Sequence, residues 1–111
     1  MEYPDFMQSY PGLDVPFSED DVRLHAVRND QTLVVFFTVL RDFLVPEHHH
    51  GPQWGALFEG ELVLTISGET RVCRPGDTWD IPAGASHSAL IKAGARFMDV
   101  FAEPDRYRLK T

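Results

Sequence analysis

The sequence contains very little cysteine: Cys73 is the single one among 111 residues. A lone cysteine cannot form an internal disulfide, so the framework typical of small secreted domains is excluded. The first residues also lack the basic and apolar regions of a signal peptide. The longest apolar run, residues 33–40, is too short to cross a bilayer, which takes about 20 residues as a helix. We therefore expect a cytoplasmic protein.

Basic residues are also scarce. Ten Lys and Arg stand against seventeen Asp and Glu, which gives a formal net charge of −7. The basic residues occur singly and form no continuous stripe along the chain. An acidic chain is repelled by nucleic acid and by anionic lipid surfaces. We expect neither as a partner.

Helical periodicity is absent as well. No segment combines a 3.6-residue apolar period with helix caps, and eight Gly and eight Pro interrupt the chain. Residues 22–26 alternate between apolar and polar instead, and residues 32–40 are β-branched and aromatic, which predicts a strand buried on both faces. Further strands are predicted at residues 62–66, 70–74, 86–92 and 96–102. Residues 74–77 (RPGD) predict a type II turn. Eight or nine short strands indicate an all-β antiparallel sandwich or barrel.

Residues 1–20 have a different composition. They contain three prolines and a glycine, which favours an irregular segment over a helix. They also contain many apolar side chains, so we expect them to pack along the body of the protein or across a dimer partner. The length suits one domain. We divide the chain into this segment and a barrel of residues 21–111.

A run of three histidines, His48-His49-His50, is the most unusual local feature. Neutral imidazole is a common ligand of divalent transition metals. In an extended segment the side chains at i and i+2 share a face, so His48 and His50 can converge on one ion while His49 points away. Residues 51–52 (GP) then bend the chain, and Gln53 can return an amide oxygen to the same point. His87, which follows a turn, is the best candidate for a fourth ligand.

Residues 46–88 contain two motifs with fixed spacing. In the first, His48-x-His50 is followed by Gln53 and, after six further residues, by Gly60. The second consists, in order, of Gly76, Pro82, Gly84 and His87. Fifteen residues separate the two motifs. This arrangement resembles the paired motifs of the cupin superfamily, in particular its small single-domain, RmlC-like members.

The resemblance implies a double-stranded β-helix, or jelly-roll, barrel that binds one divalent metal ion through His48, His50, Gln53 and His87. Iron, manganese, nickel, cobalt and zinc all suit such ligands. It also implies a homodimer. Gln is neutral, so three His and one Gln leave the +2 charge of the ion uncompensated. Such a site should attract a small anionic or carbonyl-containing molecule.

The sequence departs from the family pattern at three points. Asp42 stands where a glycine is expected six residues before His48, and Ile91 stands where the second motif ends in Asn. Two residues, rather than three or four, separate His50 from Gln53. A shift of one residue would exchange the faces of the strand and turn Glu47 and His49 inward. We favour His48 and His50, because the Gly-Pro bend can absorb the missing residue.

Three functions fit these features. The first is a metal-dependent enzyme, for example a dioxygenase, isomerase or lyase. The second is a non-catalytic module that binds or senses a small ligand. The third is a cupin with a purely structural metal. Asp80 and Asp99 are further candidates, to orient a ligand histidine. We interpret Trp54 and Trp79 as packing residues, and Cys73 as a buried, unreactive thiol.

Overall fold

The computed structural model describes residues 1–110; Thr111, the last residue of the predicted barrel segment, lies outside them. The described chain contains one short helix and eleven strands. In chain order these are α1 (Asp5–Gln8), β1 (Leu13–Asp14), β2 (Val22–Arg28), β3 (Leu33–Val39), β4 (Phe43–His48), β5 (Gln53–Glu59), β6 (Leu62–Ile66), β7 (Glu69–Cys73), β8 (Thr78–Ile81), β9 (His87–Ile91), β10 (Arg96–Phe101) and β11 (Arg108–Leu109).

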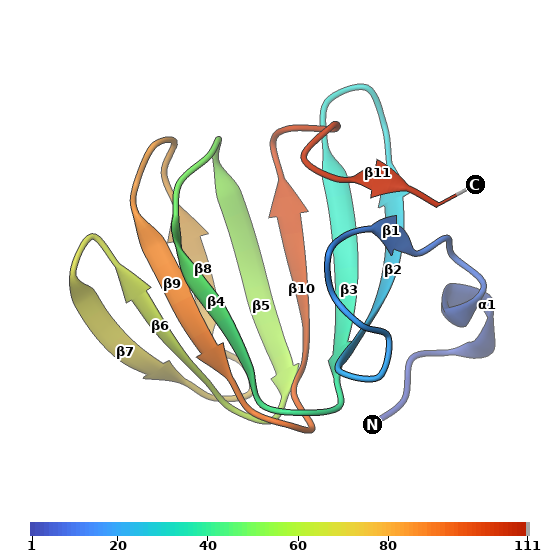
Figure 1. Ribbon diagram of the computed structural model, residues 1–111, viewed down its shortest axis with the longest axis horizontal. Coiled ribbons are helices and arrows are strands. Elements are labelled where there is room, and N and C mark those ends of the chain that lie inside the picture. Colours follow the sequence, from blue (N-terminus) through green and yellow to red (C-terminus); the bar gives the residue numbers. More distant parts are fainter. Residues whose placement is uncertain (111) are drawn as a thin grey trace.

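Two antiparallel sheets form the body of the molecule. One has the strand order β2-β3-β10-β5-β8 and the other has the order β4-β9-β6-β7, while β1 and β11 pair separately. Figure 1 shows the second sheet, with β7 at its outer edge, lying across the far end of the first. Neighbouring strands are thus often distant in sequence, as in a jelly-roll barrel. The predicted all-β fold is confirmed.

Alternation along the strands places the core between the sheets. In β3, Leu33, Val35 and Val39 are fully buried, whereas Val34 and Phe36 on the opposite face are only partly covered. The prediction that this strand is buried on both faces is therefore wrong for its outer face. A fully buried Leu or Val contributes roughly 1.5–3 kcal/mol to folding. The inward rows of both sheets together make the interior of the barrel.

The turn predicted at residues 74–77 is present. The backbone N–H of Asp77 donates to the carbonyl of Arg74 at 2.9 Å, which closes a four-residue turn. Gly76 occupies its third position with φ of +94°, where a type II turn requires a left-handed residue. The turn connects β7 to β8 and so carries the chain from one sheet to the other.

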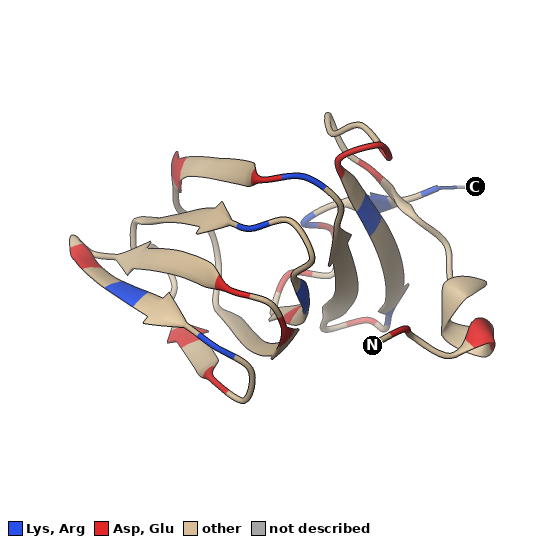
Figure 2. Ribbon diagram, turned by 90° about the horizontal axis from the view of Figure 1, so that it is seen from below, with Lys and Arg blue, Asp and Glu red and all other residues tan. Residues whose placement is uncertain are grey.

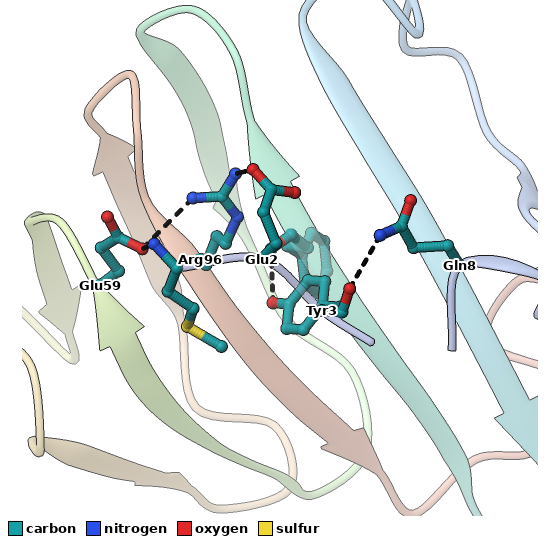
Figure 3. A network of polar contacts seen from close by, with 7 residues as sticks. Glu2, Tyr3, Gln8, Glu59 and Arg96 are labelled. Atoms are coloured by element: carbon teal, nitrogen blue, oxygen red, sulfur yellow. Dashed lines mark hydrogen bonds and ion pairs between the residues drawn. The ribbon is translucent and has the colours of Figure 1, made fainter. Parts of the chain in front are cut away.

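The N-terminal segment contacts the outer face of β3 and β10 (Figure 3). Tyr3 is buried, and its hydroxyl donates to the backbone carbonyls of Phe37 and Phe97. Burial raises the pKa of the Tyr3 phenol well above its usual value. Beside it, the Arg96 guanidinium bridges Glu2 at 2.9 Å and Glu59 at 3.2 Å.

Charged residues of both signs are scattered over the molecule. Figure 2 shows Lys and Arg as separate short stretches among Asp and Glu, with no continuous basic band along the ribbon. No helix in residues 1–110 has the length and apolar character needed to cross a membrane.

Candidate metal centre

A β-bulge sets the direction of the histidine run. β4 and β9 pair Val45 with Ala89 and next His48 with His87, so three steps along β4 match two steps along β9. The extra residue falls at Pro46 and Glu47. A bulge exchanges the faces of all residues that follow it. Strict alternation from Phe43 and Val45, which pack against the core, would have turned Glu47 inward; after the bulge, His48 points inward instead.

The structure brings His48, His50 and His87 together. One ring nitrogen from each lies within 4.8 Å of those of the other two. His48 ends β4 and His87 begins β9 in the four-stranded sheet, whereas His50 lies in the loop between β4 and β5. His87 is 5% exposed, and His48 and His50 are partly buried. These three histidines could hold a metal ion.

The backbone fixes the neutral tautomer of all three rings. Nδ1 of His48 bonds to the carbonyl of Pro46 at 2.8 Å, and Nδ1 of His50 bonds to that of Gly51 at 2.9 Å. Nδ1 of His87 bonds to a carbonyl at 3.0 Å in the same way. A carbonyl oxygen can only accept, so each Nδ1 carries a proton, and in the neutral ring it is Nε2 that keeps the lone pair. Nε2 of His50 and of His87 is buried without a hydrogen-bond partner among the described residues.

Burial also disfavours the protonated form of two of the rings. Burial is the largest cause that lowers the pKa of His50, and it lowers the pKa of His87 in the same way. The hydrogen bonds to backbone carbonyls oppose this shift in both rings. Neutral imidazole is the form that binds metal, so protons compete less at these two positions than at exposed histidines.

Gln53 adds a third unpartnered acceptor. It begins β5 in the five-stranded sheet and is 9% exposed. Its side-chain oxygen is buried and has no hydrogen-bond partner within residues 1–110, while its side chain also hydrogen-bonds to Asp99 on the neighbouring strand β10. An ionised carboxylate can only accept, so the amide nitrogen faces Asp99 and leaves the oxygen free. Unpartnered nitrogen and oxygen acceptors of this kind are suitable ligands for a divalent transition metal.

Asp99 is held in place by a second donor. It is 6% exposed, and Nε1 of Trp79 donates to its Oδ1 at 2.8 Å. Burial raises the pKa of the carboxyl to about 6, against the lowering effect of the bonds to Gln53 and Trp79. Gly55 lies against Trp79 and Asp99, and a Cβ at this position would overlap both side chains. The expected role of Asp99 was to orient a histidine; it contacts the glutamine instead.

A cavity of about 90 Å³ lies beside His48 and His87. Its polar lining consists of His48, Gln53, His87, Ser88, Asp99 and Tyr107. The remaining lining residues are apolar; Phe17 comes from the N-terminal segment and the others belong to the barrel core. The centre therefore has a small, mostly apolar chamber on one side.

The other sequence candidates lie outside this centre. Glu47 is exposed and accepts a hydrogen bond from the Ser86 hydroxyl, and His49 is exposed. Trp54 is 42% exposed on the outer face, and Asp80 is also exposed. Trp79 lines the cavity and binds Asp99, so it does more than pack.

Sequence reasoning missed the segment of residues 102–107, which follows the second motif. Its Tyr107 lines the cavity, and Glu103 accepts from the backbone N–H of Gly51 at 2.7 Å. Glu103 also lies 3.6 Å from Nδ1 of His50. No local pattern marks these residues, because the contacts join positions about fifty residues apart.

Comparison with known proteins identifies the family of the chain and solved structures with a similar fold. A family model described as "Cupin domain" matches residues 42–101, more than half of the chain. An RmlC-like cupin from Shewanella frigidimarina superposes with a TM-score of 0.77, at 21% identity over 96% of this chain and 94% of that one. KdgF from Halomonas sp. superposes with a TM-score of 0.71, at 24% identity over 84% of this chain and 87% of that one. A search of curated proteins finds no match.

Proposed function

The chain belongs to the cupin family, and from this premise we propose that it holds one divalent metal ion and binds a small anionic or carbonyl-containing molecule beside it. The ligands are His48, His50, Gln53 and His87. The observation that carries the proposal is the convergence of three histidines whose Nδ1 atoms are all engaged by backbone carbonyls. The unpartnered Nε2 atoms of His50 and His87 and the unpartnered oxygen of Gln53 are donors of the kind that a metal requires.

When bound, the ion supplies a Lewis acid that polarises a carbonyl or attracts an anion. All four protein ligands are neutral, so they leave its charge uncompensated. Asp99, behind Gln53, would hold the amide so that its oxygen stays available to the ion. The apolar core walls lower the local dielectric constant on the inner side of the site, which strengthens electrostatic attraction there.

The adjoining cavity favours a ligand-binding role over a purely structural metal, because a structural site is usually closed to further ligands, whereas here space for one lies beside the four protein ligands. The bound molecule is either converted, in dioxygenase, isomerase or lyase chemistry, or only sensed. Iron, manganese, nickel, cobalt and zinc all remain candidates for the ion. A homodimer and a cytoplasmic location also stay predictions. Sedimentation tests the first and cell fractionation tests the second.

Elemental analysis and metal titration test the proposal directly. Wild-type protein should contain about one equivalent of divalent metal, and His48→Ala, His50→Ala and His87→Ala should each reduce the metal affinity by at least tenfold. His49→Ala is the matched control, because His49 belongs to the same run and is exposed. If His49→Ala alone lost metal, the ligand set would be wrong. If no variant lost metal, the site would not be a metal centre.

A further inference from the structure

The segment of residues 102–107 is fixed across the histidine loop. The N–H of Ala102 donates to the carbonyl of Pro52 at 2.9 Å, and Glu103 accepts from the N–H of Gly51 at 2.7 Å. The N–H of Arg106 then donates to the carbonyl of Glu103 at 3.1 Å and closes a turn. These three bonds hold the turn beside the candidate metal centre and give Arg106 a defined position.

Arg106 is a partly buried cation without a counter-ion. Its guanidinium carbon lies 4.8 Å from the centroid of the Tyr107 ring, the ring that lines the cavity. Its Nε is buried and makes no hydrogen bond to any residue of the described chain. The two carboxylates of its own turn are engaged elsewhere: Glu103 with Gly51, and Asp105 with Arg28 at 3.2 Å. Within residues 1–110, Arg106 makes no ion pair.

The turn places Arg106 next to the histidine loop. Its backbone N–H donates to the carbonyl of Glu103, and the Glu103 side chain accepts from Gly51, the residue that follows His50. Apart from Tyr107, no side chain of the described residues is a partner of its guanidinium. A partly desolvated cation without a counter-ion is unfavourable, and an anion bound beside it would remove that cost.

The cavity restricts the rest of the ligand. No Lys or Arg occurs among the described residues that line it, and most of the lining is apolar. A cavity of roughly 150 Å³ with apolar walls is large enough for benzene. This one measures about 90 Å³ and so fits a shorter apolar group. It offers too few hydrogen-bonding groups for a polyhydroxylated ligand.

We propose that Arg106 binds the anionic group of the ligand beside the metal, and that the ligand is a small carboxylate whose short apolar tail enters the cavity. Arginine suits this role, since its planar guanidinium can donate two parallel hydrogen bonds to one carboxylate. The inference rests on the proposed function, because the metal supplies the other contact to the carboxylate.

Two ligands test the inference: butyrate and its neutral analogue butyramide. Each is titrated into cobalt-loaded protein, and binding is followed by visible absorption and calorimetry. Arg106→Gln should weaken butyrate binding by about tenfold or more, as loss of a charge-assisted pair predicts. The same change should leave cobalt affinity and butyramide binding within about twofold. Arg108→Gln is the matched control, because Arg108 is exposed and carries the same charge two residues away. It should leave butyrate binding unchanged.

Three outcomes would overturn the inference: equal butyrate affinity in wild type and Arg106→Gln, an equal loss for both ligands, or tighter binding of octanoate than of butyrate. If Arg106→Gln does not fold, Arg106→Lys replaces it in the same comparison. Lysine keeps the charge but loses the paired donors, so the change should weaken the binding of butyrate and not that of butyramide. A wild type that fails to bind cobalt refutes the proposed function. Cobalt binding without Arg106-dependent butyrate binding refutes only the inference.

Discussion

At the scale of single residues, the backbone prepares the candidate centre. Three carbonyls, those of Pro46, Gly51 and Ala85, hold the Nδ1 protons of the site histidines. These bonds depend on chain geometry rather than on neighbouring side chains. Gln53 has no such backbone support and depends on Asp99 for its orientation. It is therefore the ligand most sensitive to substitutions around it.

Gln53→Glu replaces a neutral ligand by an anionic one. In the metal-free protein, the new carboxylate would lie beside buried Asp99, and stability should fall by about 1–3 kcal/mol. With metal, affinity should rise by about tenfold and butyrate binding should weaken, because the net charge of the site falls by one. Thermal melts with and without metal, together with calorimetry, measure both effects. Gln31→Glu, at an exposed position, is the control. Unchanged metal and anion affinity would contradict the predicted charge effect.

Asp99→Asn tests the orienting role. Trp79 and Gln53 both donate to Asp99, and an asparagine offers only one oxygen. The amide of Gln53 should then turn, and metal affinity should fall by about 10–100-fold, as for other groups that orient metal ligands. Calorimetric titration gives the affinity, and Asp80→Asn, an exposed change on strand β8, which pairs with β5, should have no effect. Unchanged affinity in Asp99→Asn would refute this role.

At the scale of elements, the bulge in β4 decides which side chains face inward. Deletion of Glu47 should make the ladder with β9 regular, with one residue opposite one. His48 would still point inward, so metal stoichiometry should stay at about one while the bond from Ser86 is lost. Elemental analysis of the deletion variant checks this. Loss of metal on deletion would show that the bulge itself shapes the site.

The elements also show where sequence reasoning succeeds. Alternation predicted β2 and β6, because one face of each packs on the core. His87 followed from the spacing of the second motif. The bulge could not be predicted by periodicity, since one extra residue leaves the local pattern unchanged. Arg106 could not be predicted either, because its position depends on bonds from a distant loop.

At the scale of the whole molecule, metal binding should stabilise the fold. A ligand that binds only the native state adds about 2.7 kcal/mol at one hundred times its Kd. For a domain of this size, that shift raises Tm by on the order of 10 °C. EDTA should therefore lower the Tm of wild-type protein and of His49→Ala, but not of His87→Ala. Calorimetric melts check this, and an equal EDTA effect on all three proteins would count against the centre.

The candidate ligands do not lie on one sheet. His48 and His87 belong to the four-stranded sheet, and Gln53 begins a strand of the five-stranded one. An ion held by both would be a cross-link between the two halves of the barrel, placed at its open end. It would resist their separation there as a disulfide does in other small domains. A chain with one cysteine has no covalent means to do so.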